Sequence, residues 1–165
     1  MKRFMHFTVV CCLVCLASGT ALAQDARKTL PGDLTLRQAQ TVLAAALKKA
    51  EEIKVPVNIA VVDAGGNLKA FARMDDAFLG SIDIAAKKAV TARFFNMSTR
   101  DLGKASQPGQ PLYGIEVSNS GLVIFAGGVL LTDKAGAIVG AVGVSGGTVD
   151  EDESIALAGA KALKD

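Results

Sequence analysis

The stretch VNIAVVDAGGNLKAFARMD, residues 57–75, contains two candidate strands joined by a turn. Residues 57–62 are rich in β-branched side chains, which favour an extended backbone. The DAGGN segment that follows has the glycine, aspartate and asparagine residues that tight turns use. Residues 68–74 then form a second run of strand-like character. The pattern predicts an antiparallel hairpin.

A second hairpin is predicted closer to the carboxyl end. Its two arms are GLVIFAGGVLL at residues 121–131 and AIVGAVGVSGG at residues 137–147, and TDKAG at residues 132–136 supplies the turn. Hairpins pair their strands antiparallel. The two hairpins therefore predict one antiparallel sheet rather than a parallel one.

Helical segments surround the hairpins. Amphipathic or capped stretches predict helices in TLRQAQTVLAAALKKAEEI, SIDIAAKKAVTARFF and TVDEDESIALAGAKAL, at residues 35–53, 81–95 and 148–163, and a short helix in STRDLGKA, residues 98–105. Thr35 with Gln38, and Thr148 with Glu151, match the capping-box pattern. The order of helices and hairpins predicts an α+β fold, with an antiparallel sheet of about five strands flanked by helices.

Residues 1–23 have the pattern of a secretory signal peptide. The basic start MKRFMH precedes the apolar run FTVVCCLVCLASGT, and Ala21, Leu22 and Ala23 form a small-x-small cleavage site. We expect cleavage before Gln24, one domain over residues 24–165, and a periplasmic or secreted protein. The alternative is an N-terminal membrane anchor, which the short apolar run disfavours.

Cleavage at this point limits the chemistry of the mature chain. All three cysteines and the single histidine lie before residue 24, so the mature chain has neither residue type. Cysteine nucleophiles, structural zinc and histidine-bound metals are thereby excluded. Two of the 18 basic residues also leave, so that 16 remain against 16 acidic residues. This balance predicts neither a nucleic-acid partner nor, after cleavage, a membrane partner.

GVSGG at residues 143–147 matches the G-x-S-x-G pattern of hydrolase nucleophiles. A nucleophilic Ser145 would need a general base, usually histidine, to take its proton. A dyad with Lys87 or Lys88 is the formal alternative. We favour a glycine-rich strand end that leads into the helix N-cap at Thr148, with no catalytic residue in the chain.

The glycines and acids around this segment also have structural explanations. Gly140, Gly143 and Gly146 are three residues apart, which matches neither the dinucleotide pattern nor the Walker pattern. Close packing explains them more simply than an anion site at the helix start, which stays the alternative. The acidic run at residues 150–153 suits the positive end of a helix dipole, and a metal site there is less favoured.

Four motifs in order resemble one known family. They are VVDAGGNLKAFARMDDA, whose core is residues 62–77, KKAVTA at 87–92, GGV and the following strand at 127–131, and GAVGVSGGTVDEDESIA at 140–156. Together they resemble the GlcG/HbpS-like haem-binding family, related to the C-terminal domain of PduO. The resemblance implies a profilin-like fold, homo-oligomers, and binding of haem or a related tetrapyrrole.

The resemblance also implies cofactor-binding positions. Arg73 lies in the family's R-M-D stretch, Lys88 and Thr91 lie in its K-A-x-T-A helix, and Gly127 and Gly128 lie in its G-G-V stretch. In the last of these, Leu130 stands where the family has a proline, so any pocket edge formed there departs from the family pattern.

Haem iron needs an axial ligand, usually histidine, cysteine, methionine or tyrosine. The mature chain retains only Tyr113, Met74 and Met97 of these types. Tyr113 lies in GKASQPGQPLYG, residues 103–114, a loop rich in glycine and proline, and it is the candidate metal ligand. Haem held by weak oxygen ligands or by apolar contact alone is the alternative. The candidate partners of the propionates are Arg73, Lys87, Lys88 and Arg93.

Two classes of function stay open on the sequence. The first is a secreted protein that binds haem or a similar flat, anionic small molecule. The second is an enzyme, or an accessory factor of an exported oxidoreductase, that acts on a small carboxylate or aldehyde. The missing general base with a pKa near neutrality argues against the enzyme.

Overall fold

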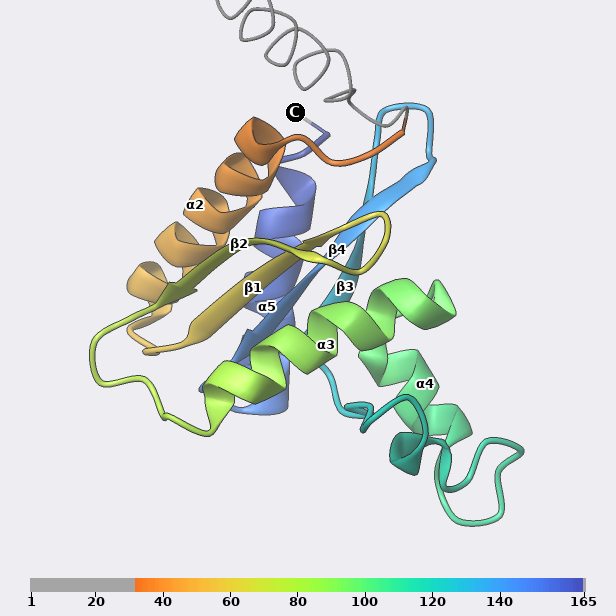
Figure 1. The fold of residues 1–165 in the computed structure, drawn as a ribbon. Helices are drawn as coiled ribbons and strands as arrows, with labels where there is room; N and C mark the ends of the chain where they lie inside the picture. Colours follow the sequence, from red (N-terminus) through yellow and green to blue (C-terminus); the bar gives the residue numbers. More distant parts are fainter. Residues whose placement is uncertain (1–31, 165) are drawn as a thin grey trace, which may run out of the picture. The chain divides into compact units, whose positions relative to one another are not determined.

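The computed structural model describes residues 32–164. The predicted signal peptide and its cleavage site lie outside this range. The elements in chain order are α2 (Leu36–Ile53), β1 (Asn58–Asp63), β2 (Leu68–Arg73), α3 (Ser81–Phe95), α4 (Thr99–Ala105), the 3-10 turn η1 (Ile115–Val117), β3 (Gly128–Thr132), β4 (Ile138–Ser145) and α5 (Val149–Lys161) (Figure 1). None of the helices in this range is both long and apolar enough to span a bilayer.

The strands form an antiparallel sheet in the order β2-β1-β4-β3. The two predicted hairpins are confirmed, and β1 joins them by pairing with β4 from Asn58 opposite Ser145 to Asp63 opposite Gly140. This central pairing leaves β2 and β3 as the edge strands. Each edge strand therefore has a neighbour on one side only within the described chain.

The described residues contribute four strands, so the expected number of about five was wrong. The first arm of the second predicted hairpin, residues 121–131, is a strand only from Gly128 to Thr132. The Val123 amide donates to Oγ1 of Thr91 on α3 instead of to a strand. Gly127 then adopts a φ of +120°, and β3 begins only at the next residue.

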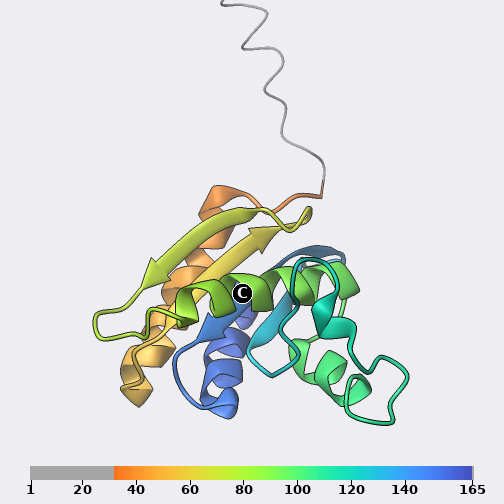
Figure 2. The same ribbon diagram turned by 60° about the horizontal axis from the view of Figure 1, so that its bottom comes forward.

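Helices cover both faces of the sheet. Figures 1 and 2 show α3 on one side and α2 with α5 on the other. Alternate strand residues follow this division, because successive side chains of a strand point to opposite faces. Ile59, Val61, Val142 and Val144 belong to the larger core under α2 and α5. The smaller core under α3 consists of Ala60, Val62, Ala85, Ala89, Ala92 and Ala141.

Small side chains let α3 lie close to the sheet. The buried hydrophobic side chains of α3 are all alanines, and they face β1 and β4. At Gly143 of β4, an added Cβ would collide with the backbone carbonyl of Ala85. The predicted explanation of the spaced glycines, close backbone packing, is confirmed at this position.

Both predicted capping boxes are present. The Oγ1 of Thr35 accepts from the Gln38 amide, and the Oγ1 of Thr148 accepts from the Glu151 amide. The acidic run lies in the first turns of α5, as predicted from the helix dipole. Within residues 32–164 no group of three or more acidic, histidine or cysteine side chains is arranged to hold a metal ion.

Candidate functional site

Lys88 connects the two helical layers through the end of the sheet. Its side chain starts on α3, is fully buried, and places Nζ 2.8 Å from the carbonyl oxygen of Val144 at the end of β4. The same Nζ lies 2.8 Å from Oδ2 of Asp152, which belongs to α5 on the opposite face. The other carboxylate oxygen of Asp152 accepts from the Gly147 amide at 3.0 Å.

Burial dominates the electrostatics of this pair. Desolvation lowers the pKa of Lys88, and the hydrogen bond and charge of Asp152 oppose that shift only in part. Desolvation likewise raises the pKa of Asp152, against the opposing effect of Lys88. For each group, the unfavourable free energy of desolvating the charge therefore exceeds the favourable interaction with its partner.

Two glycines make the space for Lys88. A Cβ on Gly127 would lie 2.7 Å from the Lys88 Nζ and 3.0 Å from the Asp152 Cβ. A Cβ on Gly128 would lie 2.5 Å from the Lys88 carbonyl oxygen, and the Gly128 amide donates to Oγ1 of Thr99 at 2.9 Å. These glycines therefore belong to the packing around the buried ion pair.

Thr91 and Phe125 close this cluster from the side of α4. The Thr91 hydroxyl accepts from the Val123 amide at 3.1 Å and so holds the segment that leads to β3. Two residues along that segment, the ring of Phe125 lies over Lys88 with its centroid 4.8 Å from Nζ. The ring is 43% exposed, so Phe125 is the layer between the buried amine and solvent.

The structure thus brings together four of the six residues predicted to bind a cofactor, namely Lys88, Thr91, Gly127 and Gly128. All four are buried and engaged with other parts of the chain. Asp152, the partner that sequence reasoning missed, lies inside the acidic run at the start of α5. The sequence pattern indicates a helix-dipole role for all of residues 150–153. No sequence pattern within this run distinguishes Asp152 as the buried residue.

Arg73 and Tyr113 lie apart from this cluster. Arg73 ends the edge strand β2 and is exposed, opposite Asn58 in the register. Tyr113 is in the loop after α4 and is 67% exposed. Figure 1 shows this loop and β2 on opposite sides of α3. The candidate iron ligand is therefore a surface phenol.

Ser145 has the position expected of a strand end. It is the last residue of β4 and is 4% exposed. Gly146 and Gly147 lead from it to Thr148, the N-cap of α5. The predicted explanation of the G-x-S-x-G match, a strand that runs into a capped helix, is confirmed in this geometry.

A family model described as haem degrading protein HbpS-like matches residues 34–161, which include every strand and helix described above. The chain belongs to the HbpS-like family. The resemblance found in the four sequence motifs is thereby confirmed. The match includes the buried Lys88 cluster, the R-M-D stretch of β2 and the loop that carries Tyr113.

Curated relatives of this HbpS-like chain include proteins of similar length and longer ones. An uncharacterized 15.0 kDa protein from the dhaT-dhaS intergenic region of Citrobacter freundii is 45% identical over 123 residues, 74% of this chain and 87% of the relative. The corrinoid adenosyltransferase PduO of the same organism is 38% identical over 82% of this chain, but the match spans 41% of PduO. Protein GlcG of Escherichia coli K12 is 35% identical over 68% of this chain and 81% of GlcG.

Solved structures share the fold. The ORFY protein of Klebsiella pneumoniae superposes with a TM-score of 0.78 at 40% identity, covering 83% of this chain and 94% of ORFY. A PduOC:heme complex superposes with a TM-score of 0.75 at 35% identity, covering 81% and 99% of the two chains. HbpS of Streptomyces reticuli, as a double mutant, gives 0.74 at 36% identity, covering 84% and 92%.

Proposed function

We propose that this HbpS-like protein binds haem or a related tetrapyrrole. The observation that carries the proposal is the similarity to the PduOC:heme complex, 35% identical in sequence and with a TM-score of 0.75 over 99% of that chain. Membership of a family described as haem degrading supports the same ligand. The profilin-like form of the fold and a homo-oligomeric state, both implied by the resemblance, are part of this proposal.

The described side chains fit an apolar ring with anionic edges. Large apolar residues are exposed on β2, on the loop after it and on α3, among them Phe71, Phe78 and Ile82. Exposed or half-buried cations lie on the same elements, at Arg73, Lys87 and Arg93. Haem would supply an iron that can accept a protein ligand, and the protein would supply apolar contact, cations and a donor atom for the iron.

Tyr113 is the candidate iron ligand of this chain, and a ring that it ligates would lie on its own side of α3 and not on β2. Of the methionines in the described range, Met74 packs against the larger core, and Met97 follows α3. The phenol of Tyr113 is the more accessible group, at 67% exposure. The other arrangement holds the ring by apolar and ionic contacts alone, without an iron ligand from this loop.

A haemin titration of the purified protein tests the proposal. We expect a saturable shift of the haem absorption band, whereas a neutral protein unrelated in sequence, measured in parallel, gives only a non-saturable change. If the two titrations coincide, haem binding is wrong. Tyr113→Phe then separates the two arrangements, because a phenolate ligand gives a spectrum that a variant without the phenol oxygen cannot produce.

A further inference from the structure

Part of the α3 side of the sheet is not covered by α3. The helix packs on β1, β4 and β3, whereas the edge strand β2 extends beyond it. The register assigns three β2 residues to this side, because Leu68, Phe71 and Arg73 lie opposite Val62, Ala60 and Asn58. Leu68 is 60% exposed and Phe71 is 37% exposed. Two large apolar side chains of β2 therefore meet solvent here.

The α3 helix, which packs on the neighbouring strand β1, has further apolar side chains on one side. Ile82, Ala86 and Val90 are four residues apart and so lie on one side of the helix. Ala86 and Val90 pack against the small alanine core, and Ile82 is 38% exposed. We call the surface formed by Leu68, Phe71, Ile82, Ala86 and Val90 the β2–α3 face. At about 3.3 Å per residue, its β2 side, from Leu68 to Phe71, is roughly 10 Å long.

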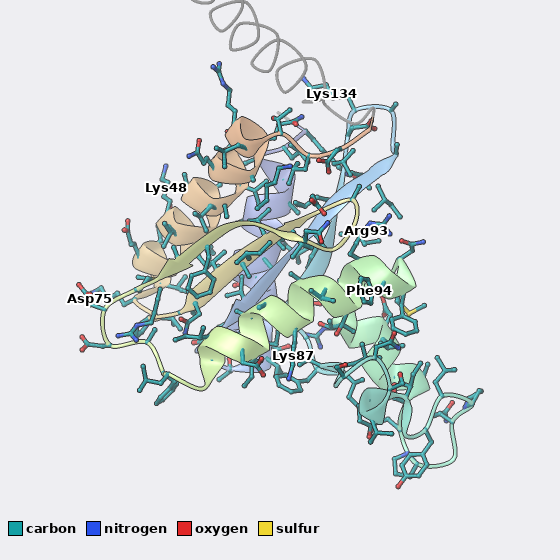
Figure 3. All side chains as sticks on the ribbon, in the orientation of Figure 1. Lys48, Asp75, Lys87, Arg93, Phe94 and Lys134 are labelled. Atoms are coloured by element: carbon teal, nitrogen blue, oxygen red, sulfur yellow. The ribbon has the colours of Figure 1, made fainter. Side chains whose placement is uncertain are left out.

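A guanidinium lies at each end of the β2–α3 face. Arg73 ends β2 beside Asn58. Arg93 follows Val90 by three residues on α3, and Figure 3 shows it near the β1–β2 hairpin, while Lys87 projects from the other side of the helix. The face thus combines an apolar centre with a cation at either end.

Arg93 has an unused donor. Its Nη1 donates to Oδ1 of Asn96 at 2.6 Å, but its Nε is buried and has no acceptor among the described residues. A buried donor without an acceptor is unfavourable in free energy. A guanidinium can donate two parallel hydrogen bonds to one carboxylate. Because this Nε is enclosed by protein atoms, a carboxylate from solvent would approach the Nη atoms of the half-buried guanidinium.

The Arg73 end is less suited to an anion. Asp75 and Asp76 follow it closely in the chain, whereas the residues adjacent to Arg93 are uncharged. The unpartnered atom at the Arg73 end is Oδ1 of Asn58, an acceptor that a carboxylate cannot satisfy. The negative end of the α3 dipole near Arg93 amounts to about half a charge, less than the two carboxylates near Arg73.

We infer that the β2–α3 face binds the flat apolar ring of a tetrapyrrole, with the carboxylate edge of the ring held by Arg93. This inference rests on the proposed function and develops the arrangement without a tyrosine ligand. The choice of ligand rests on charge complementarity. The surface is apolar and has the Arg93 guanidinium at one end. A tetrapyrrole is an apolar ring whose carboxylates lie on one edge, so the two are complementary.

The test measures haemin and haemin dimethyl ester, which lacks the acid groups, on the same variants. Arg93→Gln is expected to raise the haemin Kd by about 10- to 100-fold and the ester Kd by less than threefold, because only the free acid makes the charge-assisted bonds. Arg37→Gln on α2 is the matched control, with an unchanged Kd for both ligands.

Leu68→Ser tests the apolar part. It is expected to raise the Kd of both ligands alike, by about tenfold, because it removes apolar contact and no charge. Leu157→Ser is its control, since Leu157 is similarly exposed at 53% but lies on α5 across the sheet. Urea unfolding of every variant checks that the fold is kept.

The outcomes separate the site from the function. If the unaltered protein binds haemin but Arg93→Gln and Leu68→Ser match their controls, the β2–α3 face is the wrong site and haem binding stands. If Arg73→Gln weakens haemin binding and Arg93→Gln does not, the carboxylate edge of the ring binds at the Arg73 end of the β2–α3 face, and its assignment to Arg93 is wrong. If the unaltered protein shows no saturable binding, the proposed function fails, and this inference fails with it.

Discussion

Among single residues, Lys88 and Asp152 form an ion pair whose side chains are almost completely buried. The burial that shifts the pKa of Lys88 down and that of Asp152 up opposes charge in both groups. A pair of this kind contributes little net stability compared with apolar residues, but leaving one member alone is strongly unfavourable. Its place in the fold is to fix how α3, β4 and α5 meet.

Lys88→Met is expected to lower the free energy of unfolding by about 3–5 kcal/mol, because Asp152 then keeps a buried charge without a partner. Urea unfolding at neutral pH measures the change. Lys87→Met is the control, since Lys87 makes an exposed pair with Asp83 and its loss is expected to cost about 0.5 kcal/mol or less.

The double variant Lys88→Met with Asp152→Asn removes both charges and keeps an acceptor for the Gly147 amide. It is expected to recover more than half of the stability lost in Lys88→Met. Equal costs for Lys88→Met and Lys87→Met would show that Lys88 is not buried against a charge.

Among the helices, α2 and α5 both begin with a capping box, but the side chain that completes the box is neutral in α2 and ionisable in α5. Both have a threonine N-cap, and the reciprocal side chain is Gln38 in α2 and Glu151 in α5. Hydrogen bonds from the amide and hydroxyl of Thr148 hold the pKa of Glu151 below its ordinary value. Only the cap of α5 therefore depends on pH.

Thr148→Ala and Thr35→Ala are each expected to cost about 0.5–2 kcal/mol at pH 7, as the loss of an N-cap does. Because the folded pKa of Glu151 is lowered, its stabilisation is present above the unfolded pKa of about 4.3 and is lost as pH falls through the folded value. The cost of Thr148→Ala should therefore shrink at about pH 3, and that of Thr35→Ala should not.

Urea unfolding at the two pH values measures both costs, with each variant compared with the unaltered protein under the same conditions. A cost of Thr148→Ala that stays constant between them would mean that Glu151 does not couple its charge to the cap. Gln38 serves as the internal reference because an amide does not titrate in this range.

At the scale of the whole molecule, the pairing of β1 with β4 decides which surfaces remain open. It places both hairpins in one sheet and leaves β2 at an edge, with Leu68 and Phe71 beyond the cover of α3. The described part of the chain thus encloses the Lys88 side chain and leaves the side chains of Leu68 and Phe71 exposed.

Localisation also belongs to this scale. We expect the mature protein to start at Gln24 and to be recovered from the periplasm or the medium, because residues 1–23 have the basic start, apolar run and cleavage site of a signal peptide. The intact mass of the recovered protein measures this. A mass that still includes residues 1–23 would contradict both cleavage and the assigned localisation.

Local sequence patterns predict the helices and the two hairpins. The hairpins followed from β-branched runs around turn residues, and the helices followed from spacing and capping boxes, all of which are interactions between residues close in the chain. Through the family motifs the sequence also marked Lys88, Thr91, Gly127 and Gly128, together with Arg73, which the structure places apart from the other four. It could not show that β3 begins only at Gly128, because the segment before β3 is held by a hydrogen bond from the Val123 amide to Thr91, 32 residues earlier in the chain.

Contacts between distant segments set the surroundings of these residues. Lys88 and Asp152 are 64 residues apart, and only the packing of α3 and α5 against opposite faces at one end of the sheet brings them within 2.8 Å. In the same way, Leu68 and Arg93 border one surface because strand order leaves β2 at the edge. Whether a side chain is buried or exposed depends on which segment, distant in the sequence, packs against it. A local sequence pattern does not specify that segment.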